Sequence, residues 1–257
     1  MNTGPTAATS HTAHSPSTPT LHLDVSRERV LKRAAELIAT AWRSFDQPRD
    51  WQPSADDQTT DLFAVALPEE ASPALSVIDD AALVLDESIT PTRPRYFGFV
   101  GASGLEIGAV ADFMAACFDV NLAVDAAAAT RIDRLAGQWV ATFVGYPKEA
   151  AVTFTSGGTL SNLTALTAAR ERALAGTRRR GMSGVRAAVY TSRDAHHSVV
   201  RAAEVLGIGS NCVRSIAVDA RRRMIPEALA AAISRDRDEG VTPVATIATA
   251  GTTLVGA

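Results

Sequence analysis

Two glycines, Gly157 and Gly158, separate a short apolar segment from an amphipathic one in the stretch FTSGGTLSNLTAL, residues 154–166. Glycine lets the backbone approach a ligand closely. The first N–H groups of a helix have no partner within the helix and carry partial positive charge, so they bind anions. A helix that begins here would cradle a phosphate with Ser156, Gly157, Gly158 and Thr159. The spacing matches neither a Walker loop nor GxGxxG, so no nucleotide is implied, and an ordinary strand–helix turn with a threonine cap explains it equally well.

A pair of histidines, His196 and His197, follows a second apolar segment in the stretch TSRDAHHSVVRAAEVLG, residues 191–207. We expect Asp194 to cap a helix that has both histidines in its first turn. Open α/β sheets bind ligands at the C-terminal ends of their strands, where one imidazole could stack on a flat ring. Two exposed residues at the start of a helix would give the same pattern. HExxH spacing and a carboxylate partner are both lacking, so no metal site is predicted.

A third segment, ATIATAGTTLVGA at residues 245–257, joins an apolar run to a Gly-Thr-Thr sequence. Thr252 and Thr253 would present hydroxyls where the strand ends. Alone, the segment is equally typical of a strand end followed by a turn. Together, the three segments place a phosphate cradle, an imidazole and two hydroxyls at the C-terminal ends of adjacent parallel strands, which is where such sheets bind ligands.

These segments and the upstream stretch RPRYFGFVGASG resemble, in this order and at this spacing, the group II pyridoxal-phosphate decarboxylases. That family includes aromatic-amino-acid, glutamate and diaminobutyrate decarboxylases, and the resemblance runs from about residue 75 to the last residue. It implies an α/β fold of type I, with a mostly parallel sheet flanked by helices. It also implies pyridoxal 5'-phosphate as the cofactor and an obligate homodimer. The implied reaction converts an L-amino acid to an amine and carbon dioxide, with the cofactor ring accepting the electrons.

The resemblance also implies roles for individual residues. Ser156 to Thr159 would hold the cofactor phosphate. His196, rather than His197, falls where the histidine of the family stacks on the pyridine ring and is the candidate catalytic residue. Thr252 falls where a threonine contacts the cofactor near its ring oxygen.

The aromatic stretch upstream departs from the pattern of the family at one position. Tyr96 and Phe97 would border the substrate pocket, but Arg93-Pro94 stands where the family usually has His-Pro. Contacts to the substrate are therefore not predicted in detail, and the identity of the amino acid is not readable from these residues.

Two essential parts of the site in the family have no counterpart in these 257 residues. The aspartate that pairs with the pyridine nitrogen and the Schiff-base lysine next to a histidine are both expected beyond Ala257. The only lysines, Lys32 and Lys148, match neither motif. We therefore expect a fragment that is active only in a full-length chain. A sheet edge left unpaired predicts poor solubility or partial folding.

Three functions compete for this sequence. The order of the SGGT, AHHS and AGTT segments favours an amino-acid decarboxylase over another fold-type I enzyme, such as an aminotransferase or a cysteine desulfurase. A non-catalytic remnant that dimerises with a complete paralogue is the alternative from a different class of protein.

The elements that must position these residues follow from apolar periodicity and breakers. Strands that alternate with helices predict right-handed parallel βαβ units. Helices are expected at 26–45, 74–85, 105–118, 129–143, 159–175, from Asp194 to about 207, and at 226–238. Strands are expected at 150–155, 186–191, 212–218 and 243–249. The expected organisation is a disordered tail over 1–20, a helical dimer-wrapping segment over 21–100 and the first part of a large cofactor-binding domain over 101–257.

Composition limits the remaining choices. The 257 residues are 46% hydrophobic, which is enough for one large domain with a buried core. A net charge of −3 predicts neither a nucleic-acid nor a membrane-surface partner. The apolar runs fall short of the ~18 residues of a membrane span, and the N-terminus does not resemble a secretory signal. Two distant cysteines, Cys117 and Cys212, suit a reducing cytoplasm.

Overall fold

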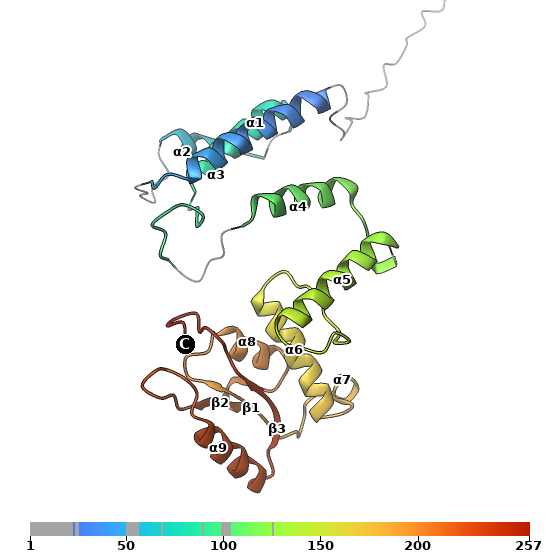
Figure 1. Ribbon diagram of the computed structural model, residues 1–257, viewed down its shortest axis with the longest axis vertical. Helices are drawn as coiled ribbons and strands as arrows, with labels where there is room; N and C mark the ends of the chain where they lie inside the picture. The colour runs from blue at the N-terminus through green and yellow to red at the C-terminus, as the bar shows by residue number, and fades with distance from the viewer. Residues whose placement is uncertain are drawn as a thin grey trace, which may run out of the picture. The chain divides into compact units, whose positions relative to one another are not determined.

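The computed structural model describes Leu23 and residues 26–49, 57–67, 69–88, 90–98, 104–124 and 126–257 (Figure 1). The chain divides into two compact units, with the boundary between Ser103 and Gly104. The expected tail over 1–20 lies outside the described residues. Among the described residues, no helix combines the length and the apolar character that crossing a bilayer requires.

The first unit is helical. It consists of α1 (Arg27–Phe45), α2 (Asp57–Phe63) and α3 (Ala74–Asp86), and α3 packs against both of the others. The two helices expected at 26–45 and 74–85 are confirmed to within one residue. The seven-residue α2 was not predicted, because so short a helix shows too little of the 3.6-residue period to stand out between prolines.

Arg93, at the position where the related family has histidine, has a structural role within this unit. Its guanidinium donates to the carbonyl oxygen of Ser44 at 2.7 Å, near the C-terminal end of α1, and to Asp86 Oδ1 at 3.2 Å. It also lies over the Phe45 ring, 5.0 Å from the centroid. A cation suits the C-terminal end of a helix, where carbonyl groups lack partners. Arg93 therefore ties α1 to the end of α3.

The second unit contains a three-stranded parallel sheet with the order β2-β1-β3. The strands are β1 (Ala187–Ser192), β2 (Val213–Ile216) and β3 (Thr242–Ile247). Both pairings are parallel, so the expected βαβ arrangement is confirmed. β1 is the central strand and is buried along its whole length. A buried central strand reads as a continuous apolar run rather than an alternating one.

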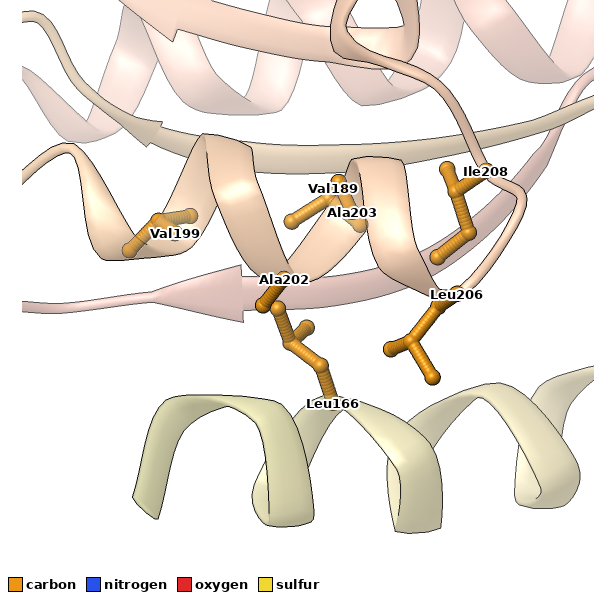
Figure 2. Packing of buried hydrophobic residues seen from close by; sticks show 7 residues of the cluster. All are labelled: Leu166, Val189, Val199, Ala202, Ala203, Leu206 and Ile208. Atoms are coloured by element: carbon orange, nitrogen blue, oxygen red, sulfur yellow. The ribbon is translucent and has the colours of Figure 1, made fainter. Parts of the chain in front are cut away.

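Neighbouring side chains of β1 point to opposite faces of the sheet. Since all of them are buried, each face is covered by helices. Val189 packs on one face with residues of α8 (Ser198–Val205) and with Leu166 of α6 (Gly158–Ala173). Figure 2 shows Leu166 pointing from α6 toward Ala202 of α8. On the other face, Ala188 and Tyr190 pack against residues of α9 (Pro226–Asp238). The result is a helix–sheet–helix sandwich, as Figure 1 shows.

The remaining elements of the second unit precede the sheet or connect its parts. The expected helices near 105–118 and 129–143 are confirmed as α4 (Glu106–Phe118) and α5 (Ala128–Phe143). The short elements are η2 (Leu122–Val124), α7 (Thr177–Arg180) and η3 (Ser210–Cys212). The third expected strand, at 212–218, is shorter than predicted, because Cys212 belongs to η3 and β2 ends at Ile216.

The prediction of a strand at 150–155 is wrong. Residues 151–155 have no regular secondary structure in the described chain. Val152 and Phe154 are 39% and 56% exposed, so this apolar segment is not enclosed by the three strands. A strand exists only when its backbone groups pair with a neighbour. Apolar composition signals the tendency to pair, but it cannot supply the neighbour.

Candidate functional site

The glycine turn lies at the start of α6 and leaves helical N–H groups free. Gly157 is the N-cap, and within the described structure no side chain caps the helix, so the threonine cap of the alternative explanation does not form. Ser161 is the first residue whose N–H bonds back, to the Gly157 carbonyl oxygen at 3.0 Å. The N–H groups just before it therefore remain available to an anion. A Cβ built on Gly157 or Gly158 would meet no described atom within 4 Å, so the space in front of the turn is open.

Two hydroxyls brace this turn. The Thr155 hydroxyl donates to the Gly157 carbonyl oxygen at 3.1 Å, and it lies 2.6 Å from Ser161 Oγ. The Gly157 carbonyl therefore points toward the side chains of Thr155 and Ser161. Such bracing holds the backbone in place without covering its N–H groups.

The two histidines lie just before α8, at the C-terminal end of β1. His196 is half-buried and His197 is exposed. Their ring centroids are 4.1 Å apart and their planes are tilted by 42°. His196 Nδ1 accepts a hydrogen bond from the backbone N–H of Ser198 at 3.2 Å and lies 2.8 Å from the Ser198 hydroxyl oxygen. His196 is therefore held by the first residue of the helix, whereas His197 lies toward solvent.

One hydrogen bond joins the two segments of the site. Asn162 Nδ2, one turn along α6 from the glycines, donates to Ser198 Oγ at 2.8 Å. Ser198 is only 1% exposed, so this contact lies in the interior. The open turn and the His196 imidazole are thus connected through two intervening side chains. Sequence reasoning missed Asn162 and Ser198. Their only signal was their position, four residues after Gly158 and two after His196.

Asp194 does not cap α8, contrary to expectation. The N-cap is His197, and the Asp194 carboxylate instead forms an ion pair with Arg222 from the loop after β2. The Asp194 side chain is only 5% exposed. A buried carboxylate is better stabilised by a full positive charge than by the partial charge of a helix end. The pair fixes the loop that carries the histidines.

Thr252 lies beyond the C-terminal end of β3. Since β1 and β3 are parallel, Thr252 and the histidine segment follow strands that end at the same edge of the sheet. The Thr191 hydroxyl donates to the carbonyl oxygen of Ile247 at 3.4 Å and links the two strand ends. Thr252 is 3% exposed, and its Oγ1 accepts the N–H of Ala257 at 3.2 Å.

Tyr96 and Phe97 belong to the first unit, whereas the residues described above belong to the second. Phe97 is 92% exposed. Tyr96 folds over the backbone, and a Cβ built on Gly98 would lie 3.1 Å from its hydroxyl oxygen. Their role at a substrate pocket stays a prediction.

Two other kinds of candidate group are the metal-ligating side chains and the lysines of the described residues. Across them, no group of three or more His, Cys, Asp or Glu side chains could hold a metal ion. The Lys148 side chain is 82% exposed beside Glu149, as expected for a surface turn. Lys32 lies on α1 in the first unit.

Comparison with known proteins identifies the family. Residues 56–257 match the pyridoxal-dependent decarboxylase conserved domain, so the chain belongs to that family. An aromatic-L-amino-acid decarboxylase of Bacillus atrophaeus is 37% identical over 167 residues, 64% of this chain and 34% of that protein. An acidic amino acid decarboxylase of Homo sapiens is 28% identical over 225 residues, 86% of this chain and 43% of that protein.

A solved structure agrees in fold. It is the glutamate decarboxylase domain of diaminobutyrate-pyruvate transaminase and L-2,4-diaminobutyrate decarboxylase from Vibrio parahaemolyticus, with a TM-score of 0.79 at 25% identity. The match covers 94% of this chain and 54% of that one, so this chain spans about half or less of each protein named here. The predicted family, α/β fold and pyridoxal-phosphate cofactor are confirmed.

The residues present fit the phosphate of that cofactor. The turn at Gly157 and Gly158 combines unpaired N–H groups with open space, which is what a phosphate dianion requires. The half-buried imidazole of His196 supplies a flat surface, and one chain of hydrogen bonds connects it to the helix that carries the turn.

Proposed function

We propose that this chain forms the phosphate-binding and ring-binding part of a pyridoxal-phosphate-dependent decarboxylase, which converts an L-amino acid to an amine and carbon dioxide. One observation carries this proposal. The hydrogen bonds from Asn162 to Ser198 and from Ser198 to His196 unite the helix of the open glycine turn with a half-buried imidazole. A turn that served only to lead the chain into α6 would need no such link.

Each group has a separate task in the proposed site. Backbone N–H groups of the turn at residues 157–160 bind the phosphate, with the Ser156 and Thr159 side chains beside them. His196 lies against the face of the ring and limits its rotation. The Thr252 hydroxyl, whose Oγ1 accepts the N–H of Ala257, donates its own proton to the ring oxygen. The bound cofactor supplies the electron sink for the electrons that carbon dioxide leaves behind.

The assembly is proposed to be a homodimer in the cytoplasm. Two free cysteines are compatible with a reducing compartment. Large apolar side chains on α4 and α5 are exposed, which is unusual for a surface that faces water alone. The most exposed of them, all at least 54% accessible, are Ile107, Phe113, Met114, Phe118, Ile132, Trp139 and Phe143. The first unit is proposed to wrap the partner subunit.

The substrate is proposed to be an amino acid that reaches a pocket bordered by Tyr96 and Phe97. The similar proteins are named for aromatic and for acidic amino acids. Release of carbon dioxide by a full-length chain from a panel of amino acids containing both classes would identify the substrate and would distinguish this proposal from a non-catalytic partner subunit.

A glycine substitution tests the phosphate site directly. Alanine at Gly158 fits without steric conflict, because its Cβ would meet no described atom within 4 Å. It would nevertheless fill part of the space assigned to the phosphate. We expect Gly158→Ala to weaken binding of pyridoxal phosphate about tenfold or more, equivalent to about 1.4 kcal/mol, and to leave binding of pyridoxal, which has no phosphate, unchanged.

Gly108→Ala on α4 is the matched control, since its Cβ would touch only Leu105 at 3.8 Å. Binding would be measured by equilibrium dialysis, with circular dichroism as the folding control. Equal affinity of the Gly158→Ala variant and the wild type for pyridoxal phosphate would exclude this turn as the phosphate site.

A further inference from the structure

We propose that Asn162 and Ser198 are positioning residues that hold His196 in the tautomer whose proton is on Nε2. The importance of this for the cofactor rests on the function proposed above, but the tautomer follows from the contacts of the protein alone. Asn162 belongs to α6, and Ser198 begins α8, so the pair also fixes one helix against the other.

The direction of each hydrogen bond determines the protonation of the ring. The backbone N–H of Ser198 can only donate, and it points at His196 Nδ1 from 3.2 Å. Nδ1 must therefore present a lone pair, and in a neutral imidazole the proton is then on Nε2. A ring protonated on Nδ1 would face this N–H with a second proton.

Asn162 strengthens the same choice through the Ser198 hydroxyl. Asn162 Nδ2 donates to Ser198 Oγ at 2.8 Å, which leaves the single hydroxyl proton free to be donated to Nδ1, also at 2.8 Å. Ser198 is 1% exposed, so water cannot readily replace either partner. The three side chains therefore form a directional chain that ends at Nδ1.

Within the described part of the chain, the other ring nitrogen is free. His196 Nε2 makes no hydrogen bond to any residue in the described part of the chain, so its N–H is the donor that the imidazole can offer to a bound ligand. His197 differs, since its side chain is exposed and no residue pair of this kind holds it. The contrast explains physically why the first histidine of the pair, and not the second, is suited to a fixed role.

The experiment is nitrogen-15 NMR of the protein labelled only at histidine, which gives two ring-nitrogen signals from each of five histidines. Spectra at alkaline pH, where histidine side chains are neutral, distinguish a protonated ring nitrogen from an unprotonated one by chemical shift. The His197→Gln variant lacks the signals of His197, so they can be distinguished from the signals of His196. We expect wild-type His196 to show an unprotonated Nδ1 and a protonated Nε2.

Two variants test the contributions of the partners. Asn162→Leu and Ser198→Ala should each raise the population of the Nδ1–H tautomer about two- to tenfold, as expected for loss of one hydrogen bond. Ser198→Thr retains the hydroxyl and should restore the wild-type ratio. Thr167→Val, which removes a hydroxyl bonded to Leu163 of the same helix, is the control and should change nothing.

The outcomes separate this inference from the proposed function. A protonated Nδ1 in the wild type, or an unchanged tautomer ratio in the Asn162→Leu variant with its fold intact by circular dichroism, would overturn it. Failure of Gly158→Ala to weaken pyridoxal-phosphate binding would instead count against the proposed site and would not alter the tautomer measurement.

Discussion

The buried Asp236 carboxylate offers the sharpest test of how the sheet is held to α9. It accepts hydrogen bonds from the Tyr190 hydroxyl at 2.7 Å and from Arg214 Nε and Nη2 at 2.9 and 2.8 Å. Tyr190 is fully buried and the Asp236 side chain is 5% exposed, whereas the Arg214 side chain is 33% exposed. One carboxylate therefore joins β1, β2 and α9.

Replacing this carboxylate should destabilise the second unit strongly. Removing one partner of a buried ion pair costs about 3–5 kcal/mol. Water can reach Arg214, so the loss of stability should lie near the lower end of this range. We expect Asp236→Ala to lower the free energy of unfolding by about 3 kcal/mol. Tyr190→Phe removes only the hydroxyl and should cost about 1.5 kcal/mol.

The assay is urea denaturation followed by circular dichroism, with Asp238→Ala as the control. Asp238 lies on the same helix but is exposed, so its replacement should change stability by no more than about 0.5 kcal/mol. In the Tyr190→Phe background, Asp236→Ala should lower the free energy of unfolding by about 1 kcal/mol less than in the wild type, because a hydrogen bond joins the two side chains. An Asp236→Ala variant within about 1 kcal/mol of wild type would refute the reasoning.

The same network predicts how stability depends on pH. Hydrogen bonds from Arg214, and then from Tyr190, hold the pKa of Asp236 below its usual value. This contribution is present above the unfolded pKa near 3.9 and is lost as pH falls through the folded value. Burial, and then Asp236, raises the pKa of Tyr190 to about 12. That contribution is complete below the unfolded pKa near 10 and is lost as pH rises toward 12. Tyr190→Phe should therefore abolish the alkaline loss and retain the acid one.

Two further predictions concern the loop before α8 and the core. Arg222→Ala leaves the buried Asp194 unpaired and should lower the thermal midpoint, with a cost of about 3 kcal/mol. Arg222 has a φ of 66°, so Arg222→Gly should be about 1 kcal/mol less destabilising than Arg222→Ala, and a larger loss for Gly would contradict this. Leu166→Ala should cost about 3 kcal/mol because Leu166 is 3% exposed, whereas Leu160→Ala on the same helix, at 43% exposure, should cost under about 1 kcal/mol by urea denaturation. Equal losses at the two leucines would show that α6 does not depend on this contact.

Much of the architecture follows from local patterns. The period of apolar residues and the proline at its first position located α9 at Pro226–Asp238. The alternation of strands and helices predicted parallel pairing, since a helical crossover brings the next strand back in the same direction. The order and spacing of four short motifs were enough for the family, because motifs of this kind can be read along the chain without knowledge of the fold.

Tertiary structure decided what depends on neighbours far away in the sequence. Residues 150–155 have the composition of a strand but no strand pairs with them in the described chain. Asp194 has the position of a helix cap but finds a full charge on Arg222, 28 residues later. Asn162 and Ser198 lie 36 residues apart and reveal their connection only when α6 packs on α8. Periodicity is local and can be read along a chain, whereas a hydrogen bond between distant residues exists only after folding has brought its donor and acceptor together.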